Sequence, residues 1–309
     1  MLLDVVILNY NSSKDTIKLT KSLMTMDKLV NNIVIVDNNS SENDKQSLLN
    51  GIEELNCKGN VHMIYSEINA GYAAGNNVGL RYVDNMKSTT ELVAIMNPDI
   101  SIEEKQLRGL LKSYELTKRK YGKESIGVFS PWMINNEHSP GIVGWKMPYF
   151  LSDIISASVV LKKLTGDVLT YKNLSRDSGI LEVDVLPGSF LLMNKMALKN
   201  IGYLDESTFL YCEERILASR MKKNGYRSFL DTGHYYYHEH SKTINKFLSD
   251  LKKIDYLYNS KKVYYIKEKQ SKLQSGIISN LRFFSKMEYF IIYNMKNLLK
   301  RYRNKRKEA

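Results

Sequence analysis

The sequence predicts an α/β protein with a parallel, doubly wound sheet in the body of the chain and a basic helical appendage after it. Apolar runs alternate with helix-like segments through the first third of the chain, a pattern typical of such sheets. The 309 residues suffice for one large domain with an appendage, or for two domains. Positive charge gathers in the last fifth of the chain, which distinguishes a charged tail from a nearly neutral body.

The predicted strands are short apolar runs. They are DVVIL from Asp4, NIVIV from Asn32, VHMIY from Val61, LVAIM from Leu92 and IGVFS from Ile126. Ser12 or Ser13 can cap a helix after the first strand, and further helices are expected over residues 75–85 and 102–118.

The regular pattern stops over residues 132–181, which we expect to be a looping stretch. It returns with a pair of strands, expected to pair with each other, around Pro187-Gly188. A helix in CEERILASRMKKNG follows, which Gly225 ends as a C′ glycine. A strand YRSFLD and the aromatic segment HYYYHEHS come next. The tail from about Lys242 is expected to be helical throughout.

Cysteine use and the N-terminal sequence restrict the compartment. Cys57 and Cys212 are far apart and lack metal-ligand spacing, which fits a reducing environment. MLLDVVILNY lacks the basic region and cleavage site of a secretory signal, and no apolar run is long enough to span a membrane. We therefore expect a cytoplasmic protein.

Polar clusters follow three of the predicted strands. The clusters are NYNSS, VDNNSS and NPD, and in the last of these Pro98 must end the strand because proline has no N–H for the ladder. In open α/β sheets, ligands bind beyond the carboxyl ends of the strands. The clusters are therefore expected to meet in one crevice, although such residues also form ordinary turns and caps.

The glycine-rich stretch NAGYAAGNNVG has Gly71, Gly75 and Gly79 at a spacing of four residues. It differs from the GxGxxG fingerprint and follows the third strand, which argues against a nicotinamide-dependent oxidoreductase. The glycines allow a loop and a helix N-terminus to approach a phosphate or sugar, and a pure packing role is equally open.

Six segments in order resemble family 2 glycosyltransferases, specifically the rhamnosyltransferase-like group. They are VVILNYN, IVIVDNNSS, NAGYAAGNNVG, IMNPDI, PGSFLLMNK and FLYCEERILASRMKKNGY, and the resemblance covers roughly residues 3–241. It implies a GT-A fold over residues 1–241, a Rossmann-like doubly wound mixed sheet. Residues 1–130 would then bind a nucleotide-sugar, residues 131–241 would form the acceptor and catalytic half, and residues 242–309 would be the tail. It also implies inverting sugar transfer with Mg²⁺ or Mn²⁺.

The resemblance assigns roles to residues at the strand ends. Asp99 matches a metal ligand on the donor diphosphate, Asn97 stands where the family's first Asp would be, and His240 or His238 is expected near the metal. Asp99 could instead be a helix N-cap, and each histidine could be structural. The expected donor-binding residues are Asn9, Tyr10, Asp37, Asn69, Gly71, Asn76 and Asn97, and Gly188 and Ser189 are expected on the acceptor side.

The same resemblance places the catalytic base in YCEER. Glu214 occupies the base position, where the family usually has Asp, and Glu213 precedes it. A further family Asp is replaced by Ile216, so the base could be either glutamate, and a non-catalytic nucleotide-sugar-binding homologue is an alternative. Adjacent glutamates in the first turn of a helix also complement its dipole without catalysis.

The tail carries the excess charge of the chain. Residues 242–309 hold 18 of the 45 Lys and Arg but only 5 of the 33 Asp and Glu, a net charge of +13 against −1 for the rest. At helical spacing, one apolar stripe comprises Ile277, Leu281, Phe284, Ile291, Met295 and Leu298, and the broadly opposite side carries Arg282, Lys286, Lys296, Lys300 and Arg303. This pattern resembles an interfacial helix attracted to anionic lipid. A plain packing helix and a nucleic-acid-binding tail are the alternatives.

Together these features predict a glycosyltransferase at the inner face of the cell membrane. It would use a nucleotide-sugar, with rhamnose suggested by the subgroup alone, to extend a lipid-linked bacterial glycan such as an O-antigen or capsule repeat unit. The near-neutral body argues against nucleic acid as a partner.

Overall fold

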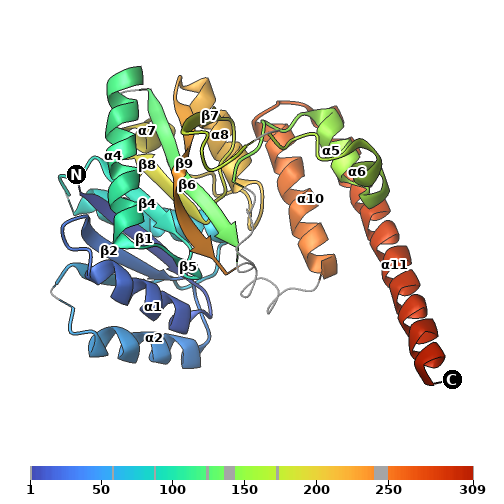
Figure 1. Cartoon of the computed structure of the whole chain (residues 1–309), viewed down its shortest axis with the longest axis horizontal. Coiled ribbons are helices and arrows are strands. Elements are labelled where there is room, and N and C mark those ends of the chain that lie inside the picture. The colour runs from blue at the N-terminus through green and yellow to red at the C-terminus, as the bar shows by residue number, and fades with distance from the viewer. Residues whose placement is uncertain are drawn as a thin grey trace. The chain divides into compact units, whose positions relative to one another are not determined.

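The computed structural model of the chain describes residues 2–57, 59–86, 88–122, 125–135, 143–171, 174–239 and 250–308 (Figure 1). It forms two compact units. The first comprises Met1–Met147 and Thr170–Phe247, and the second comprises Pro148–Leu169 and Leu248–Ala309. The sequence-based division placed a single boundary after residue 241, whereas residues 148–169 group with the C-terminal helices.

The first unit is built on one mixed, nine-stranded sheet. Its parallel part contains β1 (Leu3–Asn9), β2 (Val30–Asp37), β3 (Val61–Tyr65) and β4 (Leu92–Met96), in the order β3-β2-β1-β4. Beyond β4 the order continues with β8 (Phe190–Asn194), β6 (Ile126–Asn135), β9 (Arg227–His238) and β5 (Ile100–Ser101). β8 is antiparallel to both β4 and β6, and β7 (Ile180–Val183) pairs with β9.

The described helices of this unit connect the strands. They are α1 (Ser13–Met24), α2 (Glu42–Glu54), α3 (Tyr72–Asn85), α4 (Glu104–Tyr121), α7 (Lys195–Asn200) and α8 (Glu213–Lys223). The expected helices over 75–85 and 102–118 correspond to α3 and α4. Gly225 follows α8 at φ +79°, which confirms the predicted C′ glycine.

The apolar runs form the core, as their sequence predicts. Every residue of β4 is buried, because the strand lies between β1 and β8 inside the sheet. α3 packs closely on this layer because Gly79 has no side chain. A Cβ at this position would lie 2.5 Å from Val6 Cγ1.

Three details differ from the sequence-based expectation. β6 continues through Trp132 to Asn135, into the stretch expected to loop, because it pairs with β9 along its length. The two strands around Pro187-Gly188 do not pair with each other; β7 joins β9, whereas β8 joins β4 and β6. The tail forms two helices, α10 (Asp250–Lys267) and α11 (Lys272–Glu308), and the intervening turn has Gln270 at φ +52°.

The second unit joins α10 and α11 to α5 (Phe150–Ser156) and α6 (Val159–Thr165). Asp153 and Lys261 form a buried ion pair at 2.9 Å, and Tyr265 donates a hydrogen bond to Asp153 Oδ2 at 2.7 Å. The carboxylate of Glu288 on α11 accepts hydrogen bonds from Ser158 Oγ and the first backbone N–H groups of α6. Residues 148–169 are therefore fixed to the tail helices by polar contacts.

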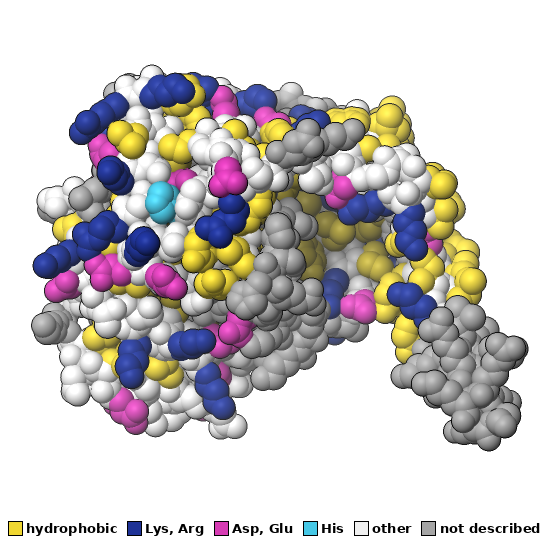
Figure 2. Space-filling view, viewed as in Figure 1, with side chains coloured by type: hydrophobic (Ala, Val, Ile, Leu, Met, Phe, Trp, Pro, Cys, Tyr) yellow, Lys and Arg dark blue, Asp and Glu magenta, His cyan; other side chains and the backbone are white. Residues whose placement is uncertain are grey.

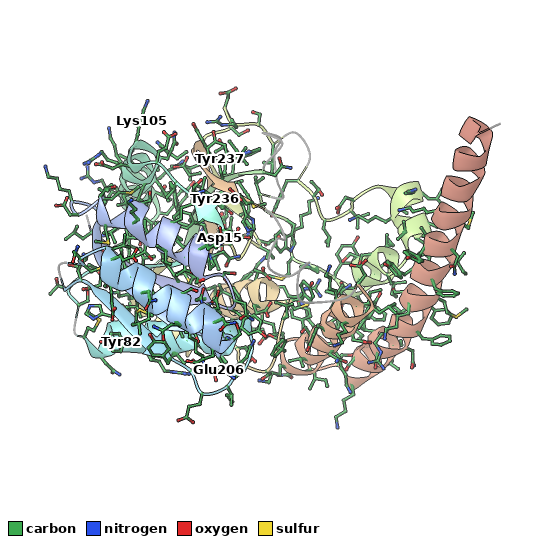
Figure 3. All side chains as sticks on the ribbon, turned by 90° about the horizontal axis from the view of Figure 1, so that it is seen from below. Asp15, Tyr82, Lys105, Glu206, Tyr236 and Tyr237 are labelled. Carbon is green, nitrogen blue, oxygen red and sulfur yellow. The ribbon has the colours of Figure 1, made fainter. Side chains whose placement is uncertain are left out.

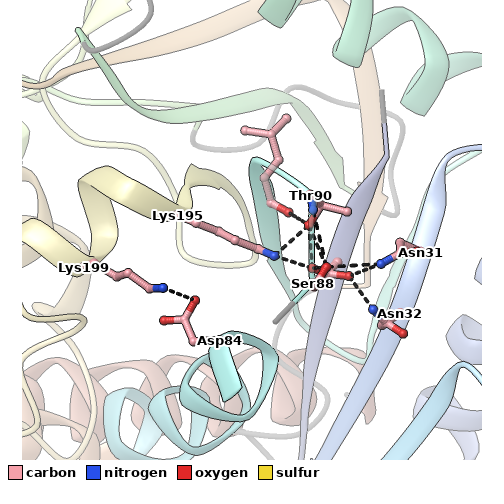
Figure 4. A network of polar contacts seen from close by, with 9 residues as sticks. Asn31, Asn32, Asp84, Ser88, Thr90, Lys195 and Lys199 are labelled. Atoms are coloured by element: carbon pink, nitrogen blue, oxygen red, sulfur yellow. Dashed lines mark hydrogen bonds and ion pairs between the residues drawn. The ribbon is translucent and has the colours of Figure 1, made fainter. Parts of the chain in front are cut away.

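A buried polar network lies at the start of β1, at the opposite end of that strand from Asn9 (Figure 4). Asp4 is fully buried and accepts hydrogen bonds from donors on three segments: Asn31, Asn32, Ser88, Thr90 and Lys195. Burial alone would raise the pKa of Asp4, but these hydrogen bonds outweigh it and the pKa is lowered. The ionised carboxylate therefore ties β1 to β2, to the residues before β4 and to α7.

We expect Asp4→Asn to destabilise the first unit by about 3 kcal/mol at neutral pH, because Lys195 would keep a buried charge without its partner. Since the folded-state pKa is depressed, the stabilisation is present above the unfolded pKa and is lost as pH falls through the folded pKa. Urea unfolding at pH 7 and at acidic pH measures both effects, and the difference between wild type and variant should shrink in acid.

Lys199→Gln is the matched control, because Lys199 forms an ion pair with Asp84 nearby but is 53% exposed (Figure 4). Its loss should cost less than about 1 kcal/mol. Equal effects of the two substitutions would contradict the role given to the buried carboxylate.

Candidate functional site

The predicted polar clusters meet at one edge of the sheet. β1, β2 and β4 are parallel, so their last residues and the loops that follow emerge on the same side. In the register of the sheet, Asn9 lies opposite Asp37 on the neighbouring strand. The expected segments therefore emerge at the same edge of the sheet, and a crevice between them stays a prediction.

Asn9 and Asp37 form the centre of the first cluster, and both are fully buried. Asn9 Nδ2 lies 2.9 Å from Asp37 Oδ1, 3.2 Å from Ser40 Oγ and 3.0 Å from Asp44 Oδ2. Asp37 Oδ2 accepts the backbone N–H of Ser40 at 3.1 Å. These bonds fix the loops after β1 and β2, and Tyr10 is partly buried beside them. A nucleoside contact by Asp37 stays a prediction.

The loop before α3 forms the second cluster. Asn38 Nδ2 donates to Asn69 Oδ1 at 3.0 Å, and the same oxygen accepts the N–H of Gly71 at 3.0 Å. Gly71 must be glycine, because φ is +101° and a Cβ would lie 2.4 Å from the carbonyl oxygen of Phe209. Asn76 is fully buried, and its Oδ1 has no hydrogen-bond partner within the described part of the chain.

Asp99 and His238 are brought together at the end of β4. β5 pairs with β9 so that Ile100 lies opposite His238, and Nε2 of this histidine is 3.2 Å from Asp99 Oδ1. Each of the two side chains is 9% exposed. His234 lies elsewhere, bonded to Asp231 at 2.8 Å, and His240 falls outside the described residues.

The donor atoms of this pair fit a hard divalent cation. A carboxylate oxygen and an imidazole nitrogen lie close enough to bind the same ion, and Mg²⁺ and Mn²⁺ sites commonly take their remaining ligands from phosphate and water. Within the described residues there is no cluster of three or more His, Cys, Asp and Glu side chains that could hold a metal. A metal role for Asp99 and His238 stays a prediction, since the pair would supply only two protein ligands.

The turn before β8 joins the metal side to the helix α8. Ser189 accepts the N–H of Asn97 with its carbonyl at 2.9 Å, and its hydroxyl lies 2.7 Å from that of Tyr236. Tyr236 is labelled in Figure 3. Tyr72 donates from its hydroxyl to the carbonyl of Gly188 at 2.7 Å. Gly188 and Ser189 thus lie between Asn97 and the glutamates of α8.

Glu213 and Glu214 begin α8, next to this turn. A Cβ on Gly188 would lie 2.8 Å from Glu214 Oε1, so glycine is needed for this close approach. Two non-glycine residues with left-handed backbone, Tyr211 at φ +72° and Cys212 at φ +69°, precede the pair. Such strain costs on the order of 1 kcal/mol per residue and is often found at functional sites.

The two carboxyl groups have perturbed proton affinities. Burial and the neighbouring Glu214 raise the pKa of Glu213 to about 8, and Glu213 is only 7% exposed. Burial also raises the pKa of Glu214, although backbone N–H groups, including that of Gly188, and the charge of Arg215 oppose the rise. Burial therefore raises the proton affinity of both carboxyl groups, and Glu213 keeps its proton at neutral pH.

The sequence reasoning missed residues that join these clusters. Tyr72 and Tyr236 lie inside quoted motifs but received no role, and Asp44 lies on the helix α2, which was not predicted. Their polar character was visible, but their partners depend on which strands pair. The predicted Asn97, Asp99, His238, Gly188, Ser189 and both glutamates do lie in connected positions.

Residues 4–121 match the family model described as glycosyl transferase family 2. A curated relative, the low-salt glycan biosynthesis hexosyltransferase Agl10 of Haloferax volcanii, is 29% identical over 222 residues. That alignment covers 72% of this chain and 62% of the relative, so the chain spans less than two thirds of the relative's length.

Solved structures share the fold at low sequence identity. S. aureus TarS 1-349 in complex with UDP superposes with a TM-score of 0.54 at 17% identity, covering 90% of this chain and 70% of that one. The mannosyltransferase PcManGT from Pyrobaculum calidifontis, in complex with GDP-Man and Mn²⁺, gives 0.53 at 13% identity, with 92% and 69% covered. GalNAc-T7 with UDP, GalNAc and Mn²⁺ gives 0.59 at 15%, with 93% and 55% covered. The predicted GT-A fold with its mixed sheet and C-terminal helical region is confirmed.

The raised pKa of Glu213 makes stability depend on pH. The folded state keeps this proton up to about pH 8, whereas the unfolded chain releases it near pH 4.5, so stability falls as pH rises between these values. Glu213→Gln removes this loss, and each pKa unit is equivalent to about 1.4 kcal/mol. We therefore expect the variant to gain stability relative to wild type from pH 5 to pH 8 in thermal unfolding.

Glu54→Gln, an exposed glutamate at the end of α2, is the control and should show no such divergence. A constant difference between Glu213→Gln and wild type across this pH range would mean that Glu213 is already ionised in the folded protein.

Proposed function

We propose that this chain is a family 2 glycosyltransferase that moves a hexosyl group, with inversion, from a nucleotide-sugar to a glycan acceptor. The observation that carries the proposal is the connected arrangement of a carboxylate–histidine pair and a glutamate pair across the Gly188-Ser189 turn. The family match over residues 4–121 covers the segments that would hold the donor.

The residues divide the reaction between them. The loops fixed by Asn9 and Asp37 would line the nucleoside pocket together with Tyr10, and the start of α3, with Asn69, Gly71 and Asn76, would face the donor. In an in-line displacement, the acceptor oxygen attacks the anomeric carbon while the bond to the diphosphate oxygen breaks. Glu214 would take the acceptor's proton, because its carboxylate lies beside the Gly188 turn and burial raises its pKa, which makes it a stronger base.

Asp99 and His238 would hold Mg²⁺ or Mn²⁺ against the donor diphosphate, with Asn97 beside them. The metal would neutralise charge that develops on the leaving diphosphate. Two structural neighbours contain Mn²⁺, which supports a divalent metal here. His240 stays a prediction.

The donor and acceptor are proposed at the level of class. The neighbours bind UDP, UDP-GlcNAc and GDP-Man, and the curated relative is named a hexosyltransferase, which supports a nucleoside-diphosphate hexose. The rhamnosyl donor stays a prediction from the motifs. A lipid-linked surface glycan, such as an O-antigen or capsule unit, is the proposed acceptor, because such acceptors lie where a cytoplasmic enzyme with a basic tail would meet an anionic membrane.

For the metal site, we expect Asp99→Asn and His238→Gln each to weaken Mn²⁺-dependent binding of UDP or GDP by at least about tenfold. Isothermal titration calorimetry with and without Mn²⁺ measures the effect. His234→Gln is the control, because His234 lies on the same strand but bonds to Asp231 outside the cluster. Unchanged metal-dependent binding in both site variants would remove these residues from the donor site.

For the base, we expect Glu214→Gln to lower turnover by roughly 10²-fold or more while donor affinity changes little, since general-base contributions have this size. Glu213→Gln should lose less activity, because Glu213 holds its proton at neutral pH. Nucleotide release during transfer measures turnover, and titration of the nucleotide measures affinity. A dead Glu213 variant beside an active Glu214 variant would exchange their roles, and two variants with wild-type turnover would place the base elsewhere. Nucleotide-sugar binding without any turnover in the wild type would favour a binding homologue.

A further inference from the structure

We propose that α11 and α6 form a face that inserts into the interfacial region of a lipid bilayer, so that apolar burial, more than charge, holds the protein there. The apolar face of α11 consists of Phe283, Phe284, Met287, Phe290, Ile291 and Met295, which are between 47% and 65% exposed. Figure 2 shows hydrophobic side chains along this helix. This inference is independent of the proposed sugar transfer.

α6 extends the apolar face. Val160 and Leu164 on α6 are 54% and 78% exposed. The backbone N–H of Val160 donates to Glu288, which lies one helical turn from Phe284 and from Ile291 on α11. The apolar surfaces of the two helices therefore adjoin, and hydrogen bonds fix their relation.

The opposite side of α11 is occupied by contacts within the second unit. Ser285 donates to the carbonyl of Ala157 at 2.5 Å, and Ile278 is fully buried. Arg282 and Lys286 both lie against Asp255 of α10, at 3.8 and 2.5 Å. Of the sequence-based stripe, Ile277, Phe284, Ile291 and Met295 are exposed, as an interfacial helix requires, and Arg282 and Lys286 are engaged in ion pairs inside the unit. The side chains of Leu298, Lys300 and Arg303 lie outside the described part of the chain.

The charge of the tail favours a lipid bilayer over a second copy of the chain as the partner that covers the apolar face. Residues 242–309 carry a net charge of +13, so a second copy would bring the same positive charge to the interface. An anionic bilayer offers both the complementary charge and an apolar interior. Within the described residues, no helix is long and apolar enough to cross a membrane, which fits an element that lies in the interface plane.

Flotation with liposomes tests the proposal. The full chain should float with vesicles of phosphatidylcholine and phosphatidylglycerol and remain largely bound at about 1 M NaCl, where charge interactions are screened within ~3 Å. Phe284→Ser combined with Phe290→Ser and Ile291→Ser should lower the bound fraction by about tenfold or more, because each side chain loses apolar burial. Leu164→Ser on α6 should lower it by a smaller factor.

Two controls separate the alternatives. Ile68→Ser replaces a residue that is 68% exposed on the first unit and should leave binding unchanged. Arg282→Gln with Lys286→Gln should also bind nearly as wild type.

Full release by salt, or a triple variant that floats like wild type, would overturn the proposal. A wild-type dimer without lipid that the triple variant converts to a monomer, measured by light scattering, would assign the face to a second copy instead.

Discussion

The candidate site depends on the pairing of β4 with β8. A parallel sheet alone would present Asn97 and Asp99 at its edge with nothing opposite them. Because β8 runs antiparallel to β4, the turn before β8 lies beside the residues after β4, and the N–H of Asn97 bonds to Ser189. This backbone bond brings the segment after β4 and the start of α8 to the same edge, where the proposed metal pair and the proposed proton acceptor lie.

The sequence predicted the strands and most of the polar residues because their signals are local. Apolar runs, Pro98 and Gly225 each act through the backbone of their own neighbourhood. The pairing of distant segments has no local signal. Nothing near Tyr236 in the sequence indicates that its hydroxyl would meet Ser189. The length of β6 depends on β9, a partner about a hundred residues away. The contacts among the site residues could not be predicted from the sequence for the same reason.

The proton affinities illustrate the same division between local and distant causes. Two adjacent glutamates at a helix start would ordinarily be solvated and favourable to the dipole. Here the surrounding fold buries them beside the Gly188 turn, and burial raises the pKa of both. The sequence places the two glutamates side by side, whereas tertiary packing buries them and thereby raises the pKa of each.

The ion pair between Asp153 and Lys261 makes the second unit discontinuous in the chain. A segment in the middle of the polypeptide and the helices at its end share one buried ion pair, so removing either segment would leave a charge of the other without its partner. Any homologue that lost the tail would be expected to have lost or rebuilt the middle segment too. The two segments should therefore be inherited together, and grafting the tail onto another catalytic domain would require its distant partner as well.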